Sequence, residues 1–155
     1  MEEFNSTWGA PLVVEVRPLV GERWVGMVEA GGLGGISAAF ATPDPTRFCA
    51  VADGMAHLVA AEMPAEEVMP IAIGVRSVVA VEVMPIALIV TDFAITALGA
   101  DGVLWEFDDL GADGLVVVST SGGVVTCSAE MFDGSATLQL DASSGRLLRT
   151  RRPPF

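Results

Sequence analysis

The chain has 155 residues, is 52% hydrophobic and carries 20 acidic against eight basic residues, for a formal net charge of −12. This length and apolar content suffice for a core, and we expect a single β domain over residues 1–155. The charge excludes a nucleic-acid-binding surface, which needs cations to replace phosphate counterions, and it disfavours an anionic membrane.

The N-terminal segment MEEFNSTWGAP begins with acidic residues after Met1 and contains no basic stretch followed by an apolar one. A secretory signal needs both, so we expect a cytoplasmic protein. The apolar stretch 68–90 has the length of a membrane span, but Arg76 and Glu82 lie in its middle. Charges are costly in hydrocarbon, so we expect buried strands there.

Short runs of Val, Ile, Leu and Ala separated by Gly, Asp and Pro are typical of an all-β protein. We expect strands at 12–17, 23–29, 36–41, 47–52, 56–61, 68–73, 75–83, 86–91, 95–98, 103–107, 115–120, 124–129, 136–140 and 146–150. The only stretch with helical composition is 60–69, where Pro64 could occupy a first turn.

Four Asp-Gly pairs stand between the apolar runs, at Asp53, Asp101, Asp113 and Asp133. These residues tolerate the positive φ angles of tight turns, so the pairs predict hairpins joined in a meander. The pentapeptide LGADG occurs twice, at 98–102 and 110–114, and each copy is expected to form a strand end and a turn. The segment VLWEFDD between them would then be one strand.

A longer period links Asp53, Asp92 and Asp133, which are spaced by 39 and 41 residues. Each precedes a run of small and apolar residues, and a spacing near forty is that of a four-stranded propeller blade. The predicted fold class is therefore all-β: an antiparallel meander of short hairpins, arranged as propeller-like repeats of about 40 residues or as a two-layer β-sandwich.

Several segments also carry a family resemblance: FCAVADGMA (48–56), ALIVTDF (87–93), GADGVLW (99–105), Leu110 with Gly114-Leu115, and LDASSG (140–145). In this order they resemble a family of small uncharacterised bacterial all-β proteins with propeller-like hairpin repeats. LDASSG by itself is similar to the hairpin of quinoprotein-like and YVTN-like propeller repeats. The family pattern has a Trp-Asp pair where this chain has CSAEMFDG. The resemblance implies a fold and brings no activity.

His57, the only histidine, lies on an apolar strand. Together with Cys49 or Cys127 it could form the dyad of a small hydrolase, because a thiolate needs a neighbouring base or cation. No third residue that would orient the imidazole is indicated. We therefore expect a non-catalytic strand residue, and two cysteines that behave as small buried hydrophobes.

The segment DDLGADG, with Asp108, Asp109 and Asp113, is similar to a calcium loop. The EF-hand spacing counted from Asp109 places Gly111 and Thr120 at positions that need oxygen-rich ligands, so the ligand set is incomplete. We expect a solvated turn here, and neither a metal nor a cofactor in the protein.

The C-terminal segment 146–155, RLLRTRRPPF, is a basic Arg/Pro tail with half of all the basic residues. One interpretation is that its strand neutralises an acidic sheet beside it, which we favour because termini without a partner are commonly loose. The other is that Pro153-Pro154-Phe155 projects as an extended segment into a groove of a neighbouring molecule.

No residue group has the spacing of an active site, so the sequence predicts a non-enzymatic acidic protein-binding domain. Its most concrete form is an immunity-type partner of a basic effector, because acidic surfaces steer onto cationic proteins. The alternative is a structural module that associates with copies of itself through strand edges and apolar surface. A small hydrolase is the third candidate. The expected partner-contacting residues are Asp108, Asp109, Asp113, Arg149, Arg151 and Arg152.

Overall fold

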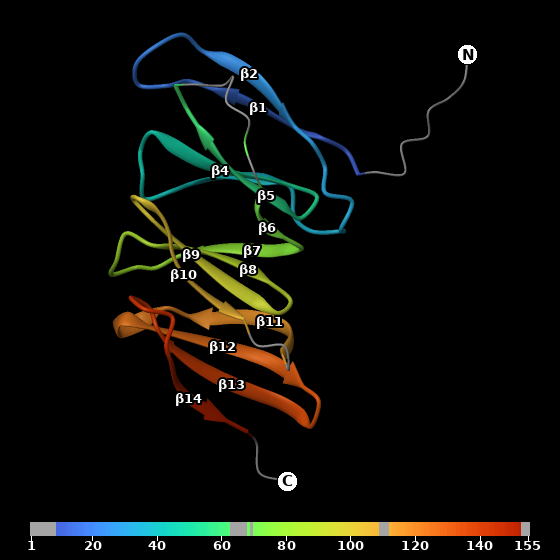
Figure 1. The fold of residues 1–155 in the computed structure, drawn as a ribbon, viewed down its shortest axis with the longest axis vertical. Helices are drawn as coiled ribbons and strands as arrows, with labels where there is room; N and C mark the ends of the chain where they lie inside the picture. Colours follow the sequence, from blue (N-terminus) through green and yellow to red (C-terminus); the bar gives the residue numbers. More distant parts are fainter. Residues whose placement is uncertain (1–8, 63–67, 69, 109–111, 153–155) are drawn as a thin grey trace, which may run out of the picture. The chain divides into compact units, whose positions relative to one another are not determined.

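Antiparallel strands joined by short turns make up the protein, as the sequence predicts (Figure 1). The computed structural model describes residues 9–62, 68, 70–108 and 112–152. Within them lie fourteen strands and one short 3-10 helix, η1 (Ser121–Gly123). Every expected strand is present, with ends that differ from the prediction by at most three residues. The all-β fold class is therefore confirmed.

The strands form four sheets in which neighbours in sequence are also neighbours in space. The first sheet pairs β1 (Leu12–Val16) with β2 (Trp24–Val28). The second contains β3 (Ala38–Ala41), β4 (Arg47–Ala52), β5 (Met55–Ala60) and β6 (Pro70–Ile73). The third contains β7 (Val75–Ala80), β8 (Ala87–Thr91), β9 (Ala94–Gly99) and β10 (Gly102–Asp108). The fourth contains β11 (Ala112–Ser119), β12 (Val124–Met131), β13 (Gly134–Asp141) and β14 (Leu147–Arg151).

The three four-stranded sheets are repeats of one meander. Their first strands begin 37 residues apart, at Ala38, Val75 and Ala112. The three aspartates that revealed the period occupy equivalent places, between the second and third strands of their sheets; these are Asp53, Asp92 and Asp133. The strand order is that of a propeller blade, so the repeat of about 40 residues is a structural unit.

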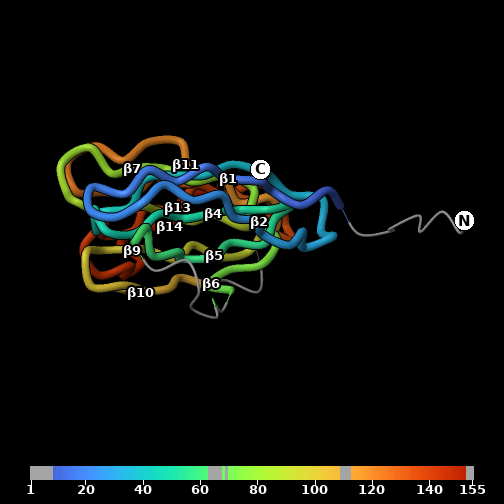
Figure 2. Tube along the Cα trace, turned by 90° about the horizontal axis from the view of Figure 1, so that it is seen from above, coloured from blue at the N-terminus to red at the C-terminus, as the bar shows by residue number. Residues whose placement is uncertain are grey.

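The Asp-Gly pairs divide into two kinds. The pairs beginning at Asp53, Asp101 and Asp133 lie at hairpin turns, and the hairpin of β9 and β10 can be followed in Figures 1 and 2. The prediction of a turn at Asp113 was wrong, because this residue and Gly114 belong to β11. The register of β11 shifts just after Asp113, and Gly114 has a φ of 57°. A positive-φ glycine serves a β-bulge as well as a turn, so the pair alone does not distinguish them.

The chain divides into two compact units, the first with Met1–Ala41 and Pro45–Val75 and the second with Thr42–Asp44 and Arg76–Phe155. In the second unit, sheet β7–β10 packs face to face on sheet β11–β14. Along β12 and β13 buried residues alternate with less buried ones, as expected for a sheet with one covered face, whereas all five residues of β8 are buried. The buried residues of this core are Val81, Ile86, Leu88, Val90, Ile95, Ala97, Trp105, Leu115, Val125, Cys127, Ala129, Leu138, Leu140 and Ala142.

A tryptophan connects the two sheets of the second unit. The indole Nε1 of Trp105, on β10, donates a 2.9 Å hydrogen bond to the carbonyl oxygen of Ala142, which follows β13. The ring lies against Gly145, where a Cβ atom would be only 2.4 Å from Trp105 Cε3. Gly145 also has a φ of 68°, so both its backbone and its lack of a side chain are required here.

The same contact recurs in the first unit. Trp24, on β2, donates its indole hydrogen to the carbonyl oxygen of Ala61 at 2.7 Å, and the two residues are again 37 positions apart. The Trp24 ring also lies 6.4 Å from that of Phe48, on β4, measured between ring centroids. The β1–β2 hairpin is thereby attached to one face of sheet β3–β6.

The tryptophan contact predicts a difference between two glycines of similar φ. Gly145→Ala should destabilise the protein more than Gly122→Ala, which is matched in φ (62°) but has no atom within 4 Å of the added Cβ. The control should cost about 1–2 kcal/mol of unfolding free energy through its backbone alone. Gly145→Ala should cost at least about twice as much because the Trp105 ring must move. Urea unfolding measures both, and equal costs would contradict the contact.

Candidate functional site

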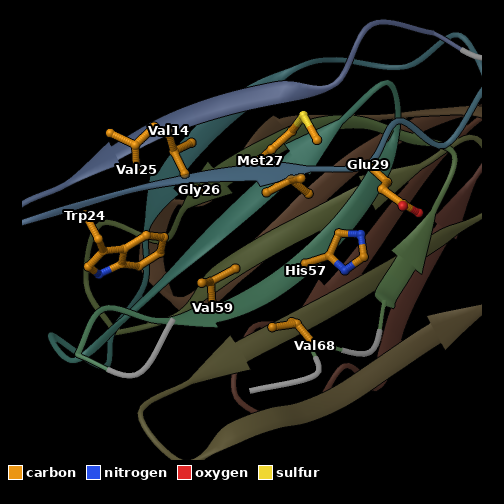
Figure 3. Close-up of a pocket in the computed structure, with 10 residues that line it drawn as sticks. Val14, Trp24, Val25, Gly26, Met27, Glu29, His57, Val59 and Val68 are labelled. Carbon is orange, nitrogen blue, oxygen red and sulfur yellow. The ribbon is translucent and has the colours of Figure 1, made fainter. Parts of the chain in front are cut away.

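A pocket of about 380 Å³ lies between the β1–β2 hairpin and sheet β3–β6, entirely within the first unit (Figure 3). Its size falls in the range of small-molecule binding sites. The described residues that line it come from β1, β2, β5 and the segments that follow β2 and precede β6; they are Val14, Trp24, Val25, Gly26, Met27, Val28, Glu29, His57, Val59 and Val68.

The pocket has an apolar end and a polar end. Figure 3 shows the Trp24 indole at one end and the side chains of Glu29 and His57 at the other, with Val59 between them. Among the described lining residues, only Glu29 and His57 carry ionisable side chains. Glu29 is exposed at the rim, one residue after β2 ends.

The imidazole of His57 contains a buried polar atom for which the described residues supply no partner. His57 lies on β5, opposite Ala50 of β4 and Pro70 of β6. Its Nε2 is shielded from solvent and forms no hydrogen bond within the part of the chain that is described. Buried polar atoms almost always have a partner, so this nitrogen is an exception among the described residues.

Gly26, on β2, lies in the wall of the pocket and against the ring of Trp24. Gly26 follows Trp24 by two positions, as Phe107 follows Trp105 in the second unit. The Phe107 ring packs against the core of its unit. A Cβ at Gly26 would lie 2.6 Å from Trp24 Cζ3, so a side chain there would displace the indole. The first unit therefore has no phenyl ring at the position that Phe107 occupies in the second.

The structure does not form the dyad of Cys49 and His57. Cys49 pairs with Leu58 on β5, whereas His57 pairs with Ala50, so the two side chains point to opposite faces of the sheet. Cys127 belongs to the second unit. Both cysteines are free, and burial raises the pKa of the Cys49 thiol to about 11 and that of Cys127 to about 12. Neither is activated as a thiolate at neutral pH.

The acidic segment between β10 and β11 is only partly described. Asp108 ends β10 and is exposed, and Asp113 lies on β11, where its Oδ1 accepts a 2.8 Å hydrogen bond from the Gly114 N–H. Asp109 lies outside the described residues, as does most of the helical segment expected at 60–69. Among the residues that are described, no three His, Cys, Asp or Glu side chains gather as a metal site, and no helix is long and apolar enough to cross a membrane.

A second candidate site is the outer face of the β1–β2 hairpin. Val13, Val25 and Met27 are 63%, 69% and 68% exposed, although all three are large and apolar. Val13 pairs with Met27 and Glu15 with Val25, so the four side chains share one face. Glu15 forms an ion pair with Arg17 at 3.0 Å. Contiguous exposed apolar side chains of this kind mark interaction surfaces.

The outer face of sheet β11–β14 combines apolar and cationic side chains. One cross-strand row on this face contains one residue from each strand: Val116, Ser128, Thr137 and Arg151. In the neighbouring row on the same face, Arg149 pairs with Gln139. Val116 is 55% exposed. Arg152, another of the predicted partner-contacting residues, forms an ion pair with Asp133. Arg149 and Arg151 thus lie beside neutral residues in the sheet, and Pro153-Pro154-Phe155 lies outside the described residues.

Comparison of the chain with protein-family models, with curated protein sequences and with solved structures gives no match. The resemblance to the bacterial all-β family stays a prediction.

The unpartnered nitrogen predicts that His57→Leu stabilises the protein. Removing a buried polar atom that lacks a hydrogen bond should raise the free energy of unfolding by about 1 kcal/mol. The matched control is Thr91→Val, because the Thr91 hydroxyl accepts hydrogen bonds from the backbone N–H groups of Phe93 and Ala94. This second change should lower stability by about 1 kcal/mol. A loss of stability in His57→Leu, measured by chemical unfolding, would show that Nε2 has a partner.

Proposed function

We propose that the protein is a non-enzymatic protein-binding module that associates with copies of itself through the outer faces of its first and last sheets. The observation that supports this most directly is the exposed apolar face of the β1–β2 hairpin, formed by Val13, Val25 and Met27. An uncovered apolar face of this kind favours a partner that removes it from water.

The repeat argues for a second copy as that partner. Within each unit, a sheet earlier in the sequence packs its face on the next sheet, and the tryptophan contact joins the pair in the same way. In the β1–β2 hairpin, one face is exposed where an earlier sheet of the repeat would pack. In sheet β11–β14, one face is exposed where a later sheet would pack. The hairpin of one copy can therefore pack on sheet β11–β14 of another, as neighbouring units stack in repeat proteins.

The composition of the two faces supports a head-to-tail arrangement. The hairpin face carries the ion-paired Glu15 and Arg17 beside its apolar residues, and the β11–β14 face carries Arg149 and Arg151 beside Val116. Each face thus offers apolar area to the other, and the two faces are not copies of one surface. Such a heterologous contact closes into a ring or extends as a filament, according to the rotation between copies.

The state of the cysteines and His57 supports a role without catalysis. The Cys49 thiol lies on the sheet face opposite His57, and burial keeps both cysteines protonated at neutral pH. The net charge of −12 still favours a basic protein, the immunity-type partner of an effector, as the competing occupant. Such a partner would be attracted by the acidic residues, among them Asp108 and Asp113, and not by the apolar hairpin face.

Self-association predicts a concentration-dependent mass above the 16.1 kDa of one chain in sedimentation or light-scattering measurements. Met27→Glu should raise the dissociation constant by about tenfold or more, because it buries a charge at the interface. Arg151→Glu should weaken association too, and most at low salt, where charges are screened least. Val20→Glu is the matched control: Val20 is 72% exposed and lies in the loop between β1 and β2.

A monomer at every concentration tested would refute self-association. Equal effects of Met27→Glu and Val20→Glu would also do so, since only Met27 lies on the proposed interface. A monomer that binds a basic protein, with affinity reduced by Asp113→Asn and unaffected by Met27→Glu, would establish the effector-type partner in its place.

A further inference from the structure

We propose that the pocket of the first unit binds a small primary amine with an apolar body. This inference rests on Glu29, His57 and Trp24, none of which belongs to the proposed self-association face, although Val25 and Met27 of that face also line the pocket. The pocket is lined by both Glu29 and His57, and it is otherwise bounded by valine and glycine residues, Met27 and the Trp24 indole.

The charge of the pocket decides between classes of ligand. An anionic ligand would face the carboxylate of Glu29, and no cationic side chain is present among the described lining residues to compensate. A neutral hydrocarbon would offer no hydrogen-bond donor to the polar end that Glu29 and His57 form. A cation that also donates hydrogen bonds meets both requirements.

The ammonium group matches the polar end. It has three N–H donors and no acceptor, so it can donate to the Glu29 carboxylate and still offer hydrogens to a second acceptor. A hydrogen bond between an ammonium and a carboxylate is charge-assisted and about twice as strong as one between neutral groups. Glu29 and His57 lie at the same end of the pocket in Figure 3, as this pairing requires.

The remainder of the pocket accepts the body of the ligand. Trp24 lies at the far end from Glu29, and the space between is lined by apolar side chains such as Val14 and Val59 (Figure 3). Trp24 is held in place by its hydrogen bond to Ala61, so its ring presents a fixed surface for stacking. The class of ligand that fits is an arylalkylamine, with the ring near Trp24 and the ammonium near Glu29.

Three probes of the same shape test the proposal by isothermal titration calorimetry: phenethylamine, 2-phenylethanol and 3-phenylpropionate. They carry the same ring on a short chain and differ in the charge of the end group. Phenethylamine should bind saturably, about tenfold or more tightly than the alcohol, because only the cation gains the charge-assisted bond. The propionate should not bind.

Variants separate the pocket from the general negative charge of the chain. Glu29→Gln should reduce the affinity for phenethylamine to that for the alcohol, and His57→Leu should reduce it several-fold. The matched control is Glu106→Gln, which removes one negative charge from an exposed position on β10, in the second unit. This control should leave the affinity unchanged. Both glutamates are exposed, so neither variant depends on refolding of the core.

Three results would overturn the proposal. The first is the absence of saturable phenethylamine binding to the wild-type protein. The second is an affinity for the amine no greater than that for the alcohol, which would show that the polar end plays no part. The third is an equal loss of affinity in Glu29→Gln and Glu106→Gln, which would show that amines are attracted by the overall charge alone.

Discussion

The hydrogen bond from a tryptophan indole to a backbone carbonyl 37 residues later holds each unit together. It joins the last strand of one sheet to the end of the third strand of the next, so it fixes both which sheets pack and which faces meet. Two sheets with one apolar face each cannot be stable apart, because that face must be covered. The tryptophan adds a directional bond to an otherwise non-directional hydrophobic contact, and it thereby selects one arrangement.

The two units use this contact with different consequences. The second unit adds Phe107 to its core, and Gly145 allows the Trp105 ring to pack closely. In the first unit Gly26 stands in place of the phenylalanine, and the β1–β2 hairpin is the smaller of the two sheets that meet there. The same repeat therefore places a phenyl ring against the core in one unit and a glycine in the wall of a pocket in the other.

The strands and turns could be predicted from the sequence because their signals are local. Alternating apolar residues and turn-forming Asp-Gly pairs located every strand, and the spacing of Asp53, Asp92 and Asp133 located the repeat. Features that depend on distant partners could not be found in this way. The bulge at Asp113 requires the register of β12, and the orphaned nitrogen of His57 requires knowledge of its neighbours. Once the register of β4 and β5 is known, the alternation of side chains along these strands places Cys49 and His57 on opposite faces of the sheet.

Both proposed binding sites involve the β1–β2 hairpin, and the small size of this sheet explains why. A two-stranded sheet is at best marginally stable alone, so it depends on what covers its two faces. Its inner face is held by Trp24 against sheet β3–β6, and the pocket lies between the two. Its outer face presents Val13, Val25 and Met27 to solvent. A ligand in the pocket and a second copy on the outer face would each stabilise the same hairpin, so occupancy of one site should favour occupancy of the other.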